Sequence, residues 1–151
     1  MSHFRTIGEG IEMTLSPEER MFLGDVLPML AGIGAPGTDP AADRLNVPVY
    51  LDDPGSNEEW WRLMGKDLEA SRQADRAVFD EAVSSDEPVV LGTDDADAVL
   101  RVLNEARLAL GARFGIDVES DHAELPEESQ QVMDYLGWIQ EELTVELMRA
   151  L

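Results

Sequence analysis

The stretch that decides the fold is residues 93–116, T-D-D-A-D-A-V-L-R-V-L-N-E-A-R-L-A-L-G-A-R-F-G-I. Its large apolar residues recur at the three- and four-residue spacing of a helix with one buried face. They are Val99, Leu100, Leu103, Leu110 and Phe114. Thr93 suits the N-cap, the aspartates that follow it suit the positive end of the helix, and Gly115 suits its end. The stretch therefore predicts a helix over about 93–114.

Two further long helices are predicted on either side of this one. Pro126 opens the later helix, about 126–150, which has a continuous apolar stripe. The stripe consists of Val132, Leu136, Ile139, Leu143 and Leu147. The pair Ser56 and Glu59 forms a capping box that predicts the start of the longest helix, about 56–84. One broad face of that helix carries the residues expected to meet the core: Trp60, Trp61, Met64, Leu68, Ser71, Val78, Phe79 and Ala82.

A fourth helix is predicted over about 17–33, because Ser16 and Glu19 form another capping box and Pro17 suits the first helical position. Pro28 predicts a kink within it, since proline has no backbone N–H. A short helical turn is expected around residues 39–46.

Strand patterns occur at two places only. Residues about 4–15 alternate apolar and polar side chains, with Gly8 and Gly10 indicating a bend or bulge. Residues 87–91 form a second short strand that pairs with the first. The prediction is a single mainly α domain over 1–151, in which four helices form a bundle-like body with a small two-stranded antiparallel β ribbon.

Composition limits the classes of function. The 151 residues carry a net charge of −21 and no cysteine, which excludes disulfides, thiolate metal sites and thiol nucleophiles. Such a negative field repels phosphate backbones and anionic lipid, so direct nucleic-acid binding is not expected. No apolar run is long enough to span a membrane, and no signal peptide is visible, so we expect a cytoplasmic protein. A partner protein with a basic surface fits the charge.

Catalytic and metal-binding patterns are weak. The sequence contains two histidines, His3 near the terminus and His122 in an acidic loop, and lacks the common nucleophile and phosphate-binding motifs. Residues 117–128 place acids at several calcium-loop positions, but His122 stands where that loop needs glycine and Pro126 comes too early. We therefore predict no enzyme activity, no metal and no cofactor. A carboxylate enzyme that uses a metal ion stays as an alternative.

Two charged residues fall on apolar helix faces. Asp75 lies in the middle of the face of the 56–84 helix, and Arg107 lies in the apolar arc of the 93–114 helix. A buried charge needs a partner of opposite sign. The prediction is that Arg107 forms an ion pair with an acid on another helix, Asp75 first, and that this pair fixes helix packing. Binding of an anion by Arg107 is the alternative.

The last helix offers a candidate interaction surface. Its apolar stripe leaves Trp138 and Val145 together on a flank, with Tyr135 close in sequence. An exposed tryptophan beside apolar neighbours is typical of a partner surface or a self-association face, so a homodimer through this flank is possible. The alternative is a helix buried on two sides.

Nearly the whole chain resembles an actinobacterial family long described as a domain of unknown function. The similarity rests on V-L-R-V-L-N-E-A-R-L-A-L-G-A-R-F-G-I, residues 99–116, on Y-L-G-W-I-Q-E-E-L, residues 135–143, and on L-S-P-E-E, residues 15–19. Four polar or glycine positions match the family motif, with no established activity: Asn104, Arg107, Gly111 and Arg113.

Members of that family are described as oxidative-stress-responsive transcription regulators that act with an alternative sigma factor. Their genes tend to neighbour the Clp protease adaptor ClpS and a cysteine-synthesis cluster. The resemblance implies a regulator that binds a sigma factor or RNA polymerase, and alternatively a partner in Clp proteolysis. Because this chain has no cysteine, it cannot sense oxidation by forming a disulfide.

Overall fold

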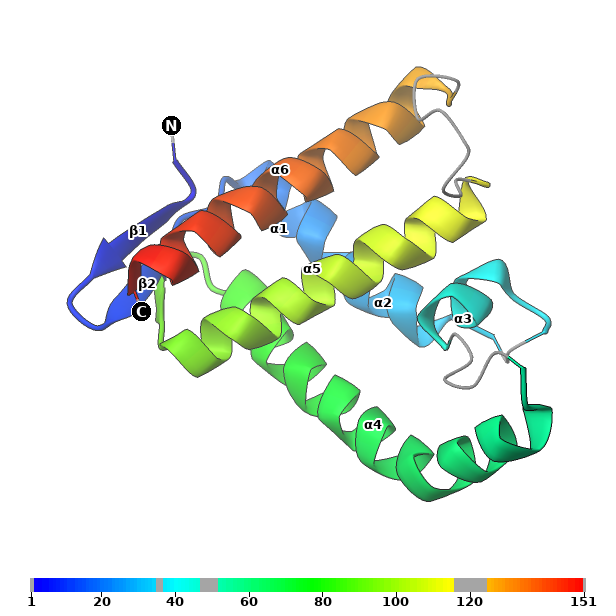
Figure 1. The fold of residues 1–151 in the computed structure, drawn as a ribbon. Helices are drawn as coiled ribbons and strands as arrows, with labels where there is room; N and C mark the ends of the chain where they lie inside the picture. Colours follow the sequence, from blue (N-terminus) through cyan, green and yellow to red (C-terminus); the bar gives the residue numbers. More distant parts are fainter. Residues whose placement is uncertain (1, 35–36, 47–51, 116–124, 151) are drawn as a thin grey trace.

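The computed structural model describes residues 2–34, 37–46, 52–115 and 125–150 (Figure 1). The helices are α1 (Pro17–Gly24), α2 (Val26–Ala31), α3 (Pro40–Leu45), α4 (Pro54–Val83), α5 (Thr93–Arg113) and α6 (Glu127–Ala150). The strands are β1 (Phe4–Ile7), β2 (Gly10–Met13) and β3 (Val89–Leu91). The predicted fold class, mainly α with a small antiparallel β element, is confirmed.

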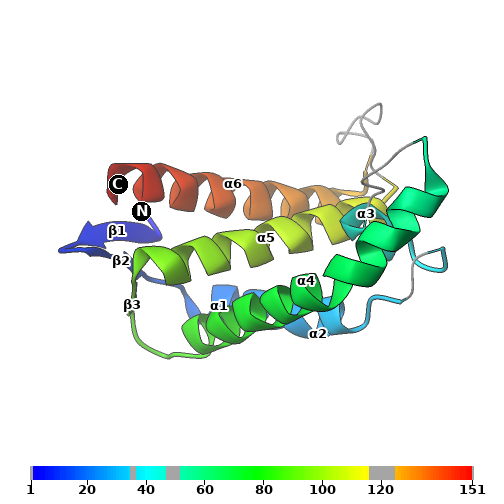
Figure 2. The same ribbon diagram turned by 60° about the horizontal axis from the view of Figure 1, so that its bottom comes forward.

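Helix α5 is the centre of the core. It packs against α6 on one side and against α3 and α4 on others, as Figures 1 and 2 show from two directions. Its buried residues include five alanines, whose small side chains let the neighbouring helices approach closely: Ala96, Ala98, Ala106, Ala109 and Ala112. Facing them, α6 buries Leu136, Ile139 and Leu143. Burying each such leucine contributes about 1.5–3 kcal/mol.

The N-terminal segment forms a hairpin rather than the single strand predicted over 4–15. Ile7 pairs with Gly10, and Gly8 has φ of +57°, which glycine adopts at the first central position of a type II′ turn. β3 then pairs antiparallel with β2, so the ribbon has the strand order β1-β2-β3. The expected pairing of residues 87–91 with the N-terminal segment is confirmed, although the sheet has one more strand than predicted.

The helix predicted over 17–33 is divided at Asp25. The Ser16–Glu19 capping box is present as expected. Pro28 has no N–H to donate to the carbonyl of Gly24, so the α-helical hydrogen bonds are interrupted one turn before the proline. The interruption lets α1 and α2 bury different residues, Leu23 on α1 and Val26 and Leu30 on α2.

Helix α4 begins slightly earlier than predicted and is capped by another residue. The carboxylate of Asp53 accepts hydrogen bonds from the N–H and the hydroxyl of Ser56, so Asp53 is the N-cap and Ser56 lies inside the helix. The predicted core face of α4 is buried only at its C-terminal end, at Phe79, Ala82 and Val83. The first half of α4 runs away from α5 in Figure 1, which explains why its apolar residues are not in the core.

Candidate functional site

The outer side of α6 carries an exposed apolar strip edged by acids. Trp138 is 50% exposed and Met148 is 70% exposed, and Val145 lies between them on the same side of the helix. Glu141 and Glu142 occupy the turn between Trp138 and Val145. We call Trp138, Glu141, Glu142, Val145 and Met148 the outer α6 strip. A shallow hollow of about 420 Å³ lies along this strip, and Ser2 of the N-terminal segment also lines it.

His3 supports this strip from beneath. Its Nδ1 lies 2.7 Å from a carboxylate oxygen of Glu142, and its Nε2 lies 2.6 Å from a carboxylate oxygen of Glu19. The imidazole ring also packs edge-on against the indole of Trp138, with ring centroids 5.0 Å apart. Both ring nitrogens lie within hydrogen-bond distance of a carboxylate oxygen. His3 thus joins the N-terminal segment to α1 and α6.

Tyr135 extends the same network to α1. Its hydroxyl donates a hydrogen bond of 2.7 Å to Glu19. Desolvation by burial, with the bond to Glu19 and that carboxylate's charge, raises the pKa of Tyr135 well above its usual range. Burial alone would raise the pKa of Glu19, but the hydrogen bonds from Tyr135 and Ser16 and the charge of His3 outweigh it and lower that pKa. Tyr135 is therefore a supporting residue rather than part of the exposed strip.

A second acid on α6 is tied to the hairpin. Glu146 is buried, accepts a 2.8 Å hydrogen bond from the hydroxyl of Thr6, and pairs with Arg149 at 2.6 Å. Together with the His3 contacts, this bond holds α6 against the N-terminal strands. The outer α6 strip is consequently presented on a fixed support.

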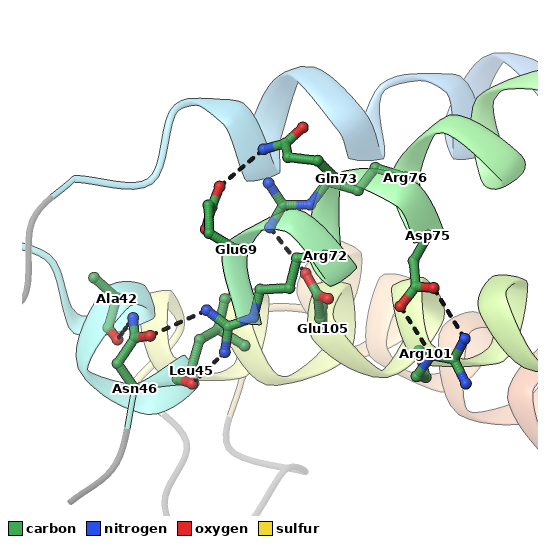
Figure 3. Close-up of polar contacts among 10 residues, drawn as sticks. All are labelled: Ala42, Leu45, Asn46, Glu69, Arg72, Gln73, Asp75, Arg76, Arg101 and Glu105. Carbon is green, nitrogen blue, oxygen red and sulfur yellow. Dashed lines mark hydrogen bonds and ion pairs between the residues drawn. The ribbon is translucent and has the colours of Figure 1, made fainter. Parts of the chain in front are cut away.

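The prediction that Asp75 pairs with Arg107 is wrong. The carboxylate of Asp75 accepts two hydrogen bonds from Arg101, at 2.8 and 2.9 Å (Figure 3). Arg107 is exposed, and no ion pair joins it to any residue that the structure describes. The reason is register: α4 and α5 cross so that Asp75 meets the turn of α5 that contains Arg101, 26 residues away in sequence.

Three of the motif residues on α5 define its contact with α6. The side-chain amide of Gln140 donates a hydrogen bond to Asn104 Oδ1 at 3.3 Å. The guanidinium of Arg107 lies 3.8 Å from where a Cβ atom at Gly137 would stand. Met133 Cε lies 3.6 Å from where a Cβ atom at Gly111 would stand. The residue numbers of the three contacts increase along α5 (104, 107, 111) and decrease by the same intervals along α6 (140, 137, 133). Asn104, Arg107 and Gly111 therefore mark one antiparallel seam. Their positions fit a structural role.

The fourth motif residue, Arg113, stabilises the start of α3. Its guanidinium donates to Asp39 at 3.1 Å. Asp39 also accepts hydrogen bonds from the backbone N–H groups of Gly34 and Ala41. Through the bond from Ala41, Asp39 is the N-cap of α3. These two N–H bonds, with the bond from Arg113, lower the pKa of Asp39 to about 2.

A groove of about 900 Å³ lies between the diverging parts of α4 and α5. One wall carries Leu68, Ser71 and Ala74 of α4, and the other carries Leu100 and Leu108 of α5. At one end of the groove Arg72 donates to the carbonyl of Leu45 and the amide of Asn46, which ties α4 to the end of α3 (Figure 3). We call this depression the α4–α5 groove.

Within residues 2–34, 37–46, 52–115 and 125–150, no group of three or more His, Asp or Glu side chains is placed to hold a metal ion. Most of the acidic loop considered as a calcium site, residues 116–124, lies outside the described residues. No described helix has both the length and the apolar character needed to cross a membrane.

Residues 1–147 match the family described as "Domain of unknown function (DUF2017)". No curated protein matches the chain, and no solved structure matches it.

Proposed function

The chain belongs to the DUF2017 family, and we propose that it is a non-enzymatic regulatory domain that binds a basic protein partner through the outer α6 strip. The observation that carries this proposal is the half-exposed Trp138, held edge-on by His3 in an acidic setting. Tryptophan is the residue type most enriched at binding hot spots, where its loss costs about 2 kcal/mol or more.

The surroundings of Trp138 favour one kind of partner. Glu141 and Glu142 flank an apolar path from Trp138 to Val145 and Met148, so the strip offers apolar area within a negative field. A complementary surface has apolar residues edged by Lys or Arg. Because the whole chain carries −21, the same field accelerates encounter with a basic surface and opposes encounter with phosphates.

The support beneath the strip also favours binding. His3 contacts Glu142 and the hydroxyl of Thr6 donates to Glu146, so two successive turns of α6 beside the strip are held by the N-terminal segment. A preorganised surface loses less conformational entropy when a partner binds. The strip therefore needs no rearrangement to present Trp138.

The partner we propose is a component of the transcription machinery, a sigma factor or RNA polymerase. This choice follows from the resemblance to oxidative-stress-responsive regulators. A disulfide sensor is excluded because the chain has no cysteine, so the proposed role is partner binding and not thiol-based sensing.

The experiment is an affinity pull-down from native lysate with three baits: the wild type, Trp138→Glu and Met21→Glu. Met21 is a matched control because it is exposed and lies on α1, away from the outer α6 strip. Mass spectrometry should identify sigma factor or polymerase subunits with the wild type and with Met21→Glu, and these should be lost with Trp138→Glu. Recovery of ClpS or a Clp ATPase instead, or of neither group, would reject the proposed partner.

A further inference from the structure

The first half of α4 has an exposed stripe with large side chains at one end and small side chains at the other. Its N-terminal part carries Trp60, Leu63 and Met64, of which Leu63 is 61% and Met64 43% exposed. One and two turns further on, the same stripe carries Ala70, Ser71 and Ala74, all exposed. The spacing of three, four and seven residues keeps these six positions on one side of the helix. We call Trp60, Leu63 and Met64 the α4 knob.

This half of α4 lacks the packing that normally stabilises a helix. None of its residues before Phe79 is buried, although the whole helix from Pro54 to Val83 is described. A glycine inside the segment, Gly65, costs about 1 kcal/mol relative to alanine. Isolated helices of about 12–15 residues are marginal in water, and most helical stability comes from covering an apolar face. The stripe is thus expected to be covered.

The α4–α5 groove is the complementary shape on the same molecule. Ser71 and Ala74, the small residues of the stripe, form one wall of it, and Leu100 and Leu108 form the opposite wall. The groove begins where the α4 knob ends, one to two helical turns along α4. Each molecule therefore carries an apolar projection and, beside it along α4, a recess whose apolar side chains are edged by charged and polar ones.

We propose that two copies of the chain associate antiparallel along α4, each inserting its α4 knob into the α4–α5 groove of the other. An antiparallel pair related by a two-fold axis near Asp67 places Trp60 opposite Ala74, Leu63 opposite Ser71 and Met64 opposite Ala70. Bulky side chains then meet small ones at both ends, which is what a two-fold interface requires of a single sequence. A parallel pair would place bulky residues against bulky residues.

The first half of α4 is nearly neutral, and it therefore favours a second copy more than the acidic α6 does. Between Pro54 and Ala74 the chain has four acids and three bases, a net charge of −1 (3 − 4), compared with −21 for the whole chain. These residues are Glu58, Glu59, Asp67, Glu69, Arg62, Lys66 and Arg72. Two such segments repel each other weakly, whereas two acidic α6 helices would repel strongly. The association therefore leaves the outer α6 strip free for its partner.

The first test is the molar mass of the full-length chain measured by sedimentation equilibrium over a wide concentration range. The wild type should form a dimer, and Leu63→Glu/Met64→Glu should raise its dissociation constant at least tenfold. Ala74→Trp, which fills the groove, should have the same effect. Met21→Glu and Trp138→Glu should dimerise like the wild type, since neither residue lies on α4.

Mixing the knob and groove variants sharpens this test. Each is monomeric alone, but the intact knob of Ala74→Trp fits the intact groove of Leu63→Glu/Met64→Glu, so the mixture should form a heterodimer. Far-UV circular dichroism checks that both variants keep their helices. A wild type that stays monomeric, a knob variant that dimerises normally, or loss of the dimer in Trp138→Glu would overturn the proposal.

The lack of cysteine provides a second readout. In an Asp67→Cys variant the two thiols lie near the two-fold axis, and oxidation should give a covalent dimer that Leu63→Glu/Met64→Glu abolishes. A Val90→Cys variant, with its thiol on the exposed face of β3, should give little covalent dimer on oxidation. Because two Asp67 carboxylates approach each other near the axis, Asp67→Asn should tighten the dimer. Equal cross-linking at the two positions, or a weaker dimer in Asp67→Asn, would contradict the antiparallel arrangement.

Discussion

Replacing Glu19 with glutamine should test the network beneath the outer α6 strip. Three donors converge on this one carboxylate: the Ser16 N–H at 3.1 Å, the Tyr135 hydroxyl at 2.7 Å and His3 Nε2 at 2.6 Å. A glutamine of the same shape has one acceptor oxygen, and its NH₂ group must face at least one of these donors. The substitution therefore removes the charge that all three groups face and replaces one acceptor oxygen by an NH₂ group.

The magnitude follows from these contacts. A hydrogen bond to a charged group contributes about 1.5–3 kcal/mol, and a half-buried donor left without an acceptor costs about 1–3 kcal/mol. Because Glu19 keeps some solvent access, we expect Glu19→Gln to lower the free energy of unfolding by about 2–4 kcal/mol. That is a large part of the roughly 5–15 kcal/mol typical of a domain.

Urea denaturation followed by circular dichroism measures this loss. The midpoint should fall while the dependence on denaturant stays constant. Glu18→Gln is the matched control, because Glu18 is exposed and adjacent, and its effect should be within about 0.5 kcal/mol. In a double-mutant cycle with Tyr135→Phe, the two substitutions should couple by more than about 0.5 kcal/mol. A Glu19→Gln effect no larger than that of Glu18→Gln would refute the reasoning.

Three further substitutions probe the packing of α3, α4 and α5. Asp39 has a folded-state pKa of about 2, below its ordinary value of 3.8, so its contribution to stability is present above pH of about 4 and is lost as the pH falls towards 2. The difference in unfolding free energy between the wild type and Asp39→Asn should therefore shrink over this range, and a constant difference would argue against the three bonds to Asp39. Arg101→Met leaves the carboxylate of Asp75, whose side chain is 13% exposed, without its partner and should cost about 1–3 kcal/mol. Arg107→Met should cost less than about 0.5 kcal/mol in urea denaturation, and the reverse order would contradict the assignment of the ion pair.

Local sequence signals predicted the helices well where a cap and an apolar period agreed. Ser16 and Glu19 fixed the start of α1, and the stripe through Leu136 and Leu143 predicted the buried side of α6. The break between α1 and α2 was harder to place, since Pro28 disturbs the hydrogen bond of a carbonyl four residues earlier. At α4 the cap was misplaced because Asp53 and Ser56 both have good capping side chains, and the bond that decides between them is a matter of geometry.

Contacts between distant segments could not be predicted from periodicity. His3 was missed because nothing near it in sequence shows that Glu19 and Glu142 approach it. Arg107 lies in the apolar arc of α5 and Arg101 lies outside it, so periodicity pointed to Arg107. The crossing of α4 over α5 brings Arg101 to Asp75 instead. The apolar face of α4 was predicted to be core throughout, but periodicity shows which side is apolar and not what covers it.

The central claim is that Trp138 and its acidic neighbours bind a basic protein surface, and the most direct measurement is an affinity. Once a sigma factor or polymerase subunit has been identified, calorimetry gives its dissociation constant with the wild type, Trp138→Glu and Met21→Glu. The account predicts that Trp138→Glu weakens binding by about thirtyfold or more, which corresponds to about 2 kcal/mol, and that Met21→Glu changes it less than about twofold. Equal affinities for the wild type and Trp138→Glu would contradict the claim.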